Sequence, residues 1–306
     1  MGSDFSLTPT PSPLRLGAVF PQTEIGADVG AVRAFAEAAQ ELGFDHLLAY
    51  DHVLGADDAR HPGLIGPYRT EHMFHEIMVL LGFVAGVVPK LELVTGVVIA
   101  PQRQTALLAK QAAEIDVLTG GRFRLGLGIG WNPVEYEALG KDFSDRGRRF
   151  EEQIELMRRL WAEPVVDFDG RWEKVTAAGL SPLPVRRSIP IWIGGTHERA
   201  LRRAARLADG YFPQRPMEGG WPRTMELMRE WVAEAGRDWA SFGVEQRISV
   251  ASGTPDDWRA TADEWAELGA THLSVVTMGA GLSGPGAHVE LLARAREALT
   301  GITARR

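Results

Sequence analysis

Short apolar runs rich in β-branched residues alternate with amphipathic stretches along almost the whole chain. Each apolar run is typical of a strand buried on both faces, and each amphipathic stretch is typical of a helix that covers such a sheet. Eight strand–helix units follow one another, which favours closure into an α/β (β/α)8 TIM barrel over an open doubly wound sheet. The predicted strands span residues 14–20, 44–50, 91–99, 123–129, 189–193, 210–212, 246–251 and 273–277.

The helices predicted between these strands end at glycines or at polar turns. They span residues 27–42, 72–88, 104–118, 146–161, 198–207, 221–235, 256–268 and 288–299. Two connections are longer than the others and predict insertions, one over residues 55–71 after strand two and one over residues 163–187 before strand five. Within the second, residues 165–172 predict a hairpin that turns at Asp169–Gly170.

Composition limits the classes of protein to which the chain can belong. Its 306 residues suit one barrel domain over residues 14–306, preceded by a polar, proline-rich segment over residues 1–13 that we expect to be disordered. The net charge of -7 argues against a nucleic-acid or membrane-surface partner, and no apolar run is long enough to span a membrane. The chain has no cysteine, which excludes disulfides and thiolate chemistry. We expect a cytoplasmic protein.

In a barrel of this kind the chemistry lies where strands end. Asp51 and His52 directly follow strand two, and an imidazole beside a carboxylate is suited to acid–base work near neutral pH. The alternative is that Asp51 caps backbone amides and His52 completes a turn. Gly96 interrupts strand three, where it marks a bulge, a close ligand approach or a crowded barrel interior.

Three alternate glycines, Gly126, Gly128 and Gly130, remove side-chain bulk from one side of strand four. A flat ligand can lie against such a strand, or a large neighbour in the barrel can fill the space. Strand five runs through Gly194–Gly195–Thr196 directly into a helix. Backbone amides at a helix N-terminus bind phosphate, and the competing interpretation is a tight turn capped by threonine.

Other polar clusters are assigned to structure. His72 and His75 lie three residues apart beside acidic residues, but no metal-binding motif accompanies them, so no metal site is predicted. The arginines of residues 146–149 precede several glutamates, a pattern typical of ion pairs on a solvated helix.

Four passages together resemble the luciferase-like monooxygenase superfamily, and within it the branch that depends on coenzyme F420. They are FDHLLAYDHV over residues 44–53, LVTGVVIAPQRQTALLAKQAAEIDVLTGGRFRLGLGIGW within 91–131, RGRRFEEQIELMRRLW over 146–161, and IPIWIGGTHERALRRAARLADGYFPQ over 189–214. The resemblance implies a luciferase-like barrel with the cofactor ring at the C-terminal mouth. It also implies a homodimer.

The resemblance further implies roles for individual residues. His52 matches the catalytic histidine of hydride transfer, Asp51 matches a cofactor contact, and Gly96–Val97 matches a non-prolyl cis peptide behind the deazaflavin ring. The remaining matches are to ring or ribityl contacts (Ile129, Gly130) and to phosphate contacts (Gly194, Gly195, Thr196). Hydride then passes between coenzyme F420 and a small organic substrate, with His52 moving the matching proton, oriented by Asp51 or by backbone.

One departure bears on the substrate. Sugar-phosphate dehydrogenases of the superfamily carry an acidic residue after the glycines of strand four, where this chain has Trp131. We therefore expect no carboxylate partner for His52 at that point and no sugar-phosphate substrate. Trp131, with Phe20, Tyr50 and Tyr68 predicted nearby, favours a flatter or more apolar molecule.

Two alternatives remain open. A two-component monooxygenase that uses FMN would have the same fold, and FMN shares a ring system, ribityl chain and phosphate with the deazaflavin. Positive charge for the anionic tail of coenzyme F420 would distinguish the two, and Arg103, Arg215 and His197 are the candidates. A flavin-binding protein without catalysis is the other alternative, because a barrel fold alone does not define an activity.

Overall fold

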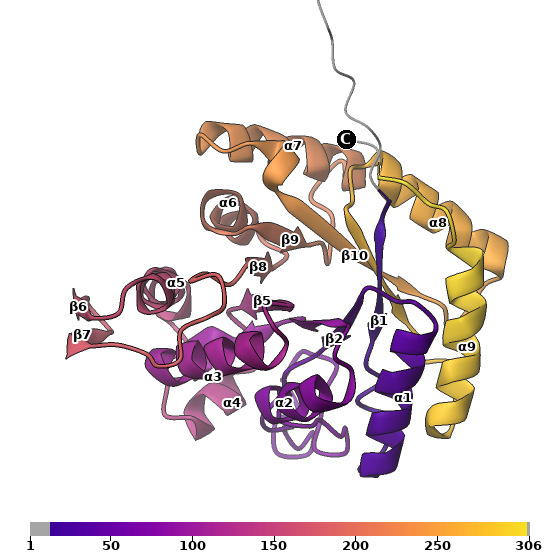
Figure 1. Ribbon diagram of the computed structural model, residues 1–306, viewed down its shortest axis with the longest axis horizontal. Coiled ribbons are helices and arrows are strands. Elements are labelled where there is room, and N and C mark those ends of the chain that lie inside the picture. Colours follow the sequence, from indigo (N-terminus) through magenta and orange to yellow (C-terminus); the bar gives the residue numbers. More distant parts are fainter. Residues whose placement is uncertain (1–12, 305–306) are drawn as a thin grey trace, which may run out of the picture.

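The computed structural model describes residues 13–304, in which parallel strands form a closed barrel surrounded by helices (Figure 1). The pairing order is β3-β2-β1-β11-β10-β9-β8-β5-β4, and β3 also pairs with β5 and so closes the ring. The predicted (β/α)8 barrel is therefore confirmed. Its strands are β1 (Arg15–Val19), β2 (His46–Ala49), β3 (Glu92–Thr95), β4 (Val98–Ile99), β5 (Phe123–Gly128), β8 (Ile191–Gly194), β9 (Gly210–Phe212), β10 (Gly243–Ser249) and β11 (His272–Val276).

The third predicted strand is divided into β3 and β4. Between them the Gly96–Val97 peptide bond is cis, as the resemblance implied. Thr95 directly precedes this interruption, and its hydroxyl donates a hydrogen bond of 2.8 Å to the carbonyl oxygen of Gly126 in β5. The two parts therefore stay attached to the neighbouring strand on either side of the break.

The main helices alternate with the strands around the barrel. They are α1 (Val29–Glu41), α2 (Ile77–Val87), α3 (Thr105–Leu118), α5 (Arg146–Ala162), α6 (Glu198–Leu207), α7 (Gly220–Glu234), α8 (Pro255–Glu267) and α9 (Gly284–Ala298), with short helices η1 (Ala100–Gln102), α4 (Pro133–Ala138) and η2 (Trp239–Ser241). The prediction that α2 begins at residue 72 is wrong: Glu76 caps its first turn by accepting the N–H of Val79 at 2.8 Å. Helix α4 was not predicted.

Both predicted insertions are present. The second contains β6 (Val166–Asp169) and β7 (Lys174–Ala178), an antiparallel hairpin that protrudes at one edge of the molecule in Figure 1. The N–H of Gly170 donates to the carbonyl oxygen of Glu173, so the turn falls at the predicted Asp-Gly step. The first insertion is fastened by an isolated bridge between Ala56 and Arg69.

The apolar core has two parts. The larger lies between strands and helices, and the smaller lies inside the barrel. The inner part is contributed by five different strands (Val19, Leu48, Val94, Trp192, Phe212), which form a layer of side chains that fills the ring.

A buried ionic cluster also lies inside the barrel. The Glu245 carboxylate of β10 contacts Nε2 of His46 from β2 at 2.9 Å and accepts from the Ser274 hydroxyl of β11 at 2.5 Å and from Arg124 of β5 at 2.5 Å. The guanidinium of Arg124 lies 4.2 Å from the centre of the Trp192 ring. Four strands are thus joined through one carboxylate. Burial raises the pKa of Glu245, but Arg124 and His46 outweigh it and hold that pKa well below its ordinary value.

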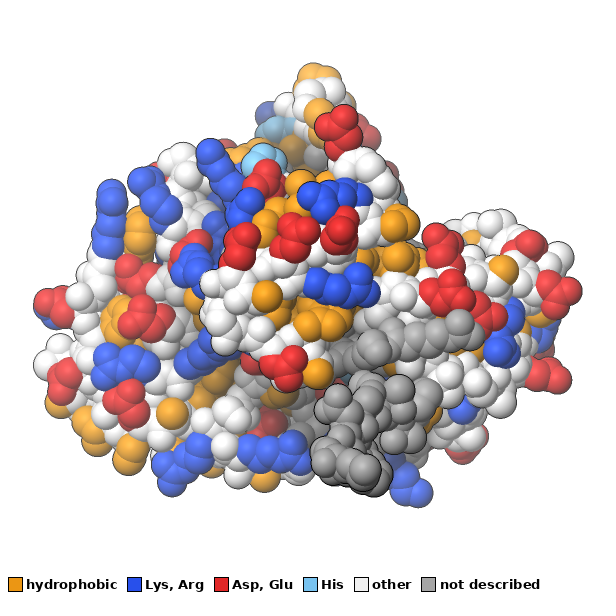
Figure 2. All heavy atoms as spheres, turned by 90° about the horizontal axis from the view of Figure 1, so that it is seen from above, with side chains coloured by type: hydrophobic (Ala, Val, Ile, Leu, Met, Phe, Trp, Pro, Cys, Tyr) orange, Lys and Arg blue, Asp and Glu red, His pale blue; other side chains and the backbone are white. Residues whose placement is uncertain are grey.

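The outer surface carries both signs of charge. Figure 2 shows acidic and basic side chains interspersed on one face. Among residues 13–304, no helix is long and apolar enough to cross a membrane. The predicted disordered segment over residues 1–13 lies outside the described residues except for Pro13, which forms an isolated antiparallel bridge with Thr303.

Replacing Glu245 by glutamine should destabilise the barrel because it leaves the buried guanidinium of Arg124 short of negative charge. We expect a loss of about 3 kcal/mol of unfolding free energy at pH 7, measured by urea denaturation. The pKa of Glu245 is lower in the folded chain than in the unfolded one. The difference in unfolding free energy between wild type and variant should therefore become smaller as the pH falls below about 4.3. The control is Glu226→Gln, at an exposed surface pair with Arg223, which should leave stability unchanged. Equal stability of the two variants would show that the cluster is dispensable.

Candidate active site

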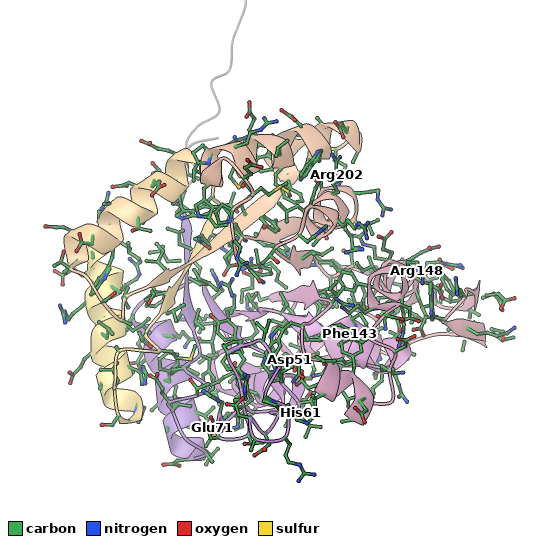
Figure 3. The ribbon with its side chains drawn as sticks, turned by 180° about the vertical axis from the view of Figure 1, so that it is seen from behind. Asp51, His61, Glu71, Phe143, Arg148 and Arg202 are labelled. Atoms are coloured by element: carbon green, nitrogen blue, oxygen red, sulfur yellow. The ribbon has the colours of Figure 1, made fainter. Side chains whose placement is uncertain are left out.

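A cavity of about 430 Å³ lies at the C-terminal ends of the strands. Its walls come from the ends of β2, β4, β5 and β8, from the first insertion and from α5 and α6. Figure 3 shows Asp51 at this end of the barrel, with His61 and Glu71 farther out in the neighbouring loop region. The volume is in the range of small-molecule sites, which is about 300–1,000 Å³.

The cavity brings together all but one of the residues expected in catalysis, at the substrate, or at the ring, ribityl chain and phosphate of the cofactor. Those that line it are Tyr50, Asp51, His52, Tyr68, Gly96, Val97, Ile129, Gly130, Trp131, Gly194, Gly195 and Thr196. The exception is Phe20, predicted to contact the substrate. It is fully buried in the core against Phe35 and His75, with ring centres 5.9 and 6.0 Å away, because β1 ends at Val19 and the next side chain turns away from the mouth.

His52 has a carboxylate partner, neither at position 131, where none was expected, nor at Asp51, which was expected to orient it. Nδ1 of His52 lies 3.2 Å from Oε1 of Glu135, which the short helix α4 carries into the site. The same oxygen accepts the N–H groups of Val53 at 2.8 Å and Leu54 at 3.1 Å. Burial raises the pKa of Glu135, but the hydrogen bond to His52 and these two N–H groups outweigh it and leave the pKa below its ordinary value.

This arrangement fixes the imidazole. A charged Glu135 beside Nδ1 favours the tautomer with the proton on Nδ1, leaving Nε2 as the nitrogen available for chemistry. Among the described residues, Nε2 of His52 has no hydrogen-bond partner, while the ring lines the cavity. His52 therefore has the geometry of a general acid or base.

Asp51 does not orient His52. Its carboxylate accepts from Arg103 at 2.7 Å and from the N–H of Ile99 at 3.1 Å, so it ties strand two to the start of η1. Burial raises the pKa of Asp51, whereas Arg103 and the Ile99 amide favour its charged form. Arg103 also donates to Glu76 at 2.9 Å. Both of its partners are thus internal, and Arg103 does not line the cavity.

Aromatic rings surround His52. The ring centres of Tyr68, Phe74 and Trp131 lie 4.7, 4.9 and 5.6 Å from that of the imidazole. Burial raises the pKa of Tyr68 to about 12, so its phenol stays protonated. The side of the cavity beside His52 is therefore largely aromatic.

Arg69 holds the insertion in place over this site. Its guanidinium donates to the carbonyl oxygens of Leu64 at 2.9 Å, Gly66 at 2.8 Å and Tyr68 at 2.9 Å, and it is paired with Asp58. The backbone of Gly66 lies so close to the Trp131 ring that a Cβ atom there would fall 2.1 Å from it. Arg69 thus holds the backbone of Tyr68 and the backbone of Gly66, which packs on the Trp131 ring.

The glycines of strand four leave room for neighbouring protein groups. A Cβ atom at Gly126 would fall 1.8 Å from the carbonyl oxygen of Thr95, and one at Gly128 would fall 2.7 Å from Val97. Gly130 has a positive φ of 64° and lies against Ile99. Neighbouring groups therefore occupy the space beside all three glycines, while Gly128 and Gly130 also line the cavity together with Val97.

The other end of the cavity is suited to an anion. The N-terminus of α6 opens there, and the N–H groups of Thr196, His197 and Glu198 donate to no acceptor among the described residues. The helix is capped by His197, whose Nδ1 accepts the N–H of Arg199 at 3.1 Å, so the threonine cap considered above is wrong. Thr196 is left at the cavity wall.

Of the three cation candidates that the sequence offered, only His197 lines the cavity, and sequence reasoning missed the arginines of the site. Arg146, Arg203 and Arg247 line the cavity, whereas Arg215 does not. The arginine run at the start of α5 was assigned to a solvated helix, but Arg146 packs on Phe143, with 3.7 Å between the guanidinium and the ring centre. A charge pattern alone does not show which end of a helix faces the barrel mouth.

The two histidines assigned to structure take part in packing. Nδ1 of His72 accepts the N–H of Arg69 at 3.0 Å, and Nε2 of His75 lies 3.4 Å from the carbonyl oxygen of Gly26. Neither lines the cavity. Both lie before α2 and not on it.

The comparisons with known proteins identify the family. The sequence model of the luciferase-like monooxygenases matches residues 11–301, and the chain belongs to this family of oxidoreductases. An uncharacterized protein of Mycobacterium tuberculosis is 35% identical over 191 residues, which are 60% of this chain and 64% of that protein. The chain thus spans less than two thirds of this relative.

Two further proteins represent the two possible cofactors. The FMNH(2)-dependent dimethylsulfone monooxygenase of Pseudomonas putida is 27% identical over 244 residues, 78% of this chain and 62% of the relative. The structure of an F420-dependent secondary alcohol dehydrogenase in complex with an F420-acetone adduct has a TM-score of 0.74 at 16% identity, covering 94% of this chain and 99% of the other. This second likeness shows the fold.

Replacing Arg69 by glutamine should loosen the insertion, because it removes the guanidinium shared by three carbonyl groups. We expect amide hydrogen exchange over residues 55–71 to become about tenfold faster or more, since buried hydrogen bonds to a charged group are lost. The matched control is Arg60→Gln, an exposed arginine of the same insertion, which should exchange at the wild-type rate. Unchanged protection in the Arg69 variant would show that other contacts hold the loop.

Proposed function

We propose that this chain is an oxidoreductase that transfers a hydride between coenzyme F420 and a small, largely apolar substrate bearing an alcohol or carbonyl group. The observation that carries the proposal is the His52–Glu135 pair, which presents Nε2 to a cavity at the barrel mouth. Transfer of a hydride to or from a carbon next to oxygen requires a proton to move at that oxygen, and a fixed imidazole can move it.

The residues of the cavity fit a deazaflavin. Val97 and Ile129 would lie against the ring system, and the open amides at the start of α6 would hold the phosphate. Arg146 and Arg247 line the cavity without an ion pair among the described residues, and Arg203 lines it while paired with Glu151 at 2.9 Å; this positive charge favours a cofactor with an anionic tail in addition to its phosphate. When bound, the deazaflavin supplies the hydride donor or acceptor.

Side chains of the protein transfer the proton and exclude water. Nε2 of His52 takes the proton from the substrate hydroxyl as the carbon loses its hydride, and it returns the proton in the reverse reaction. Glu135 keeps the other ring nitrogen protonated and favours the imidazolium that forms. Tyr68 and Trp131 exclude water from this part of the cavity and select for apolar substrates.

The second candidate is an FMN-dependent two-component monooxygenase. The FMN-dependent relative from Pseudomonas putida favours it, and the same phosphate and ring contacts would hold FMN. The homodimer stays a prediction.

The first experiment is a fluorescence titration of the purified protein with coenzyme F420 and, separately, with FMN. We expect micromolar or tighter binding of coenzyme F420 and much weaker binding of FMN. Arg203→Gln should weaken coenzyme F420 binding by about tenfold, because a charge-assisted contact is lost. Arg202→Gln, at an exposed arginine of the same helix paired with Glu198, is the control and should bind normally. Preference for FMN would reject the proposal and favour the second candidate.

Turnover is followed as the substrate-dependent change in cofactor absorbance across a panel of aryl and alkyl secondary alcohols and ketones. We expect His52→Ala to lower kcat by about 100-fold or more with little effect on cofactor affinity, since it removes the proton-transfer group. Glu135→Gln should lower kcat less than His52→Ala does, because a neutral amide can still hydrogen-bond to the imidazole but no longer stabilises the imidazolium by its charge.

His61→Ala changes an exposed histidine of the first insertion and serves as the control. It should have wild-type turnover and an unchanged pH profile. Substantial turnover in His52→Ala would assign His52 to structure instead of catalysis.

A further inference from the structure

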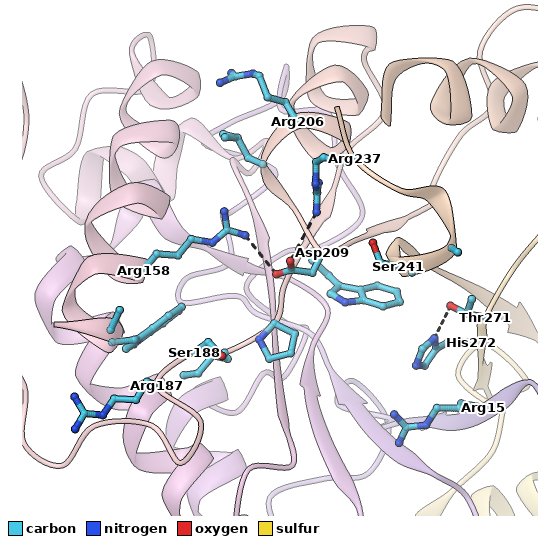
Figure 4. A pocket seen from close by; sticks show the side chains of 18 of the residues that line it. Arg15, Arg158, Arg187, Ser188, Arg206, Asp209, Arg237, Ser241, Thr271 and His272 are labelled. Carbon is cyan, nitrogen blue, oxygen red and sulfur yellow. Dashed lines mark hydrogen bonds and ion pairs between the residues drawn. The ribbon is translucent and has the colours of Figure 1, made fainter. Parts of the chain in front are cut away.

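A second cavity, of about 1270 Å³, opens at the opposite end of the barrel (Figure 4). The starts of β1, β8, β10 and β11 form its floor, and the C-terminal parts of α5 and α6 form part of its walls. Among the described residues, it shares no lining residue with the cavity at the mouth. In barrels of this class the N-terminal end ordinarily serves stability, so a large cavity there that is lined by several arginines calls for another explanation.

The charges that line this cavity are predominantly positive. Its charged lining residues are five arginines and one acidic residue (Arg15, Arg158, Arg187, Arg206, Arg237, Asp209). Figure 4 shows Arg158 and Arg237 converging on Asp209 from different sides, whereas Arg187 and Arg206 point away from it. Arg15 and Arg206 are paired with Glu92 and Glu151, which do not line the cavity, so the positive charge available to a ligand is mainly that of Arg158, Arg187 and Arg237.

The single carboxylate is shared. Oδ2 of Asp209 already accepts the N–H of Ile191 at 2.8 Å and receives Arg158 at 3.3 Å, while Oδ1 lies 3.8 Å from Arg237. Burial and the positive charge of Arg158 lower the pKa of Arg237, although Asp209 acts in the opposite direction. The two guanidiniums are therefore incompletely neutralised, and a bound anion would complete their coordination.

The floor of the cavity is aromatic. The rings of Trp192 and His272 meet edge to face with their centres 5.0 Å apart. Nδ1 of His272 lies 2.7 Å from the Thr271 hydroxyl, and its Nε2 has no hydrogen-bond partner among the described residues. Burial and the nearby Arg124 keep the pKa of His272 well below its ordinary value, so this ring is neutral. A neutral ring beside an indole suits the uncharged body of a ligand.

We propose that this cavity is a second ligand site that binds an organic phosphate with a planar body. Arg158 and Arg237 bind the phosphate group in place of part of the contact they make with Asp209, and the aromatic floor contacts the body. Planar guanidiniums match the oxygens of a phosphate, and the volume leaves room for a molecule much larger than phosphate itself. The site is separate from the mouth and does not depend on the function proposed for it.

The test is calorimetric titration with phenyl phosphate at low ionic strength, with inorganic phosphate as the comparison. We expect phenyl phosphate to bind more tightly than inorganic phosphate. The double variant Arg158→Gln/Arg237→Gln should bind phenyl phosphate about tenfold more weakly or worse. Asp209→Asn should bind it more tightly, because the internal competitor loses its charge while its side-chain oxygen can still accept the N–H of Ile191.

Two controls assign the binding to this cavity. Arg223→Gln changes an exposed arginine of α7 that is paired with Glu226, and it should bind phenyl phosphate like wild type. Arg203→Gln removes an arginine of the mouth and leaves Arg158, Arg237 and Asp209 in place. Loss of binding in Arg203→Gln with wild-type binding in the double variant would overturn the proposal, and so would weaker binding in Asp209→Asn. Because Asp209→Asn has the opposite expected sign, it tests the site even where the double variant does not fold.

Discussion

The carboxylate of Glu245 is the interaction on which the barrel most depends. It lies inside the ring, fully removed from water, and takes contacts from His46, Ser274 and Arg124 on three other strands. A charge in such a place is tolerated only when its partners are held in position, so the four strands must keep their register for the charge to be satisfied. The apolar layer that includes Trp192 fills the inside of the barrel, and the ionic cluster fixes the relative positions of the strands through directional contacts.

That register decides where each strand ends, and the strand ends build the mouth. His52 lies three residues after the end of β2, but the orientation of its imidazole also depends on Glu135, which comes from a six-residue helix after β5. The same carboxylate accepts two backbone N–H groups beside His52. One side chain therefore fixes both the loop after β2 and the imidazole that this loop carries, which couples local structure directly to chemistry.

The fold could be predicted from the sequence because hydrophobic periodicity is local. The positions of Asp51, His52 and Gly194–Thr196 followed from it, since each lies at the end of an apolar run. Glu135 could not be found in this way, because a six-residue helix has too few turns to show a period and its partner is 83 residues away in the chain. The substrate contact predicted for Phe20 is wrong for a different reason. An apolar residue at a strand end is equally suited to the core, and packing against Phe35 decides its direction.

The mouth also shows how charge is divided between structure and binding. Its carboxylates are occupied within the protein, Asp51 by Arg103 and the Ile99 amide, and Glu135 by His52 and backbone N–H groups. Its arginines are less fully paired, because Arg146 and Arg247 form no ion pair among the described residues, whereas Arg203 is paired with Glu151 at 2.9 Å. A site whose carboxylates are committed to positioning, and whose wall keeps unpaired positive charge, has a field that favours an anionic ligand. An acidic chain can hold such a ligand because pairing inside the protein, not net charge, determines the field that the ligand meets.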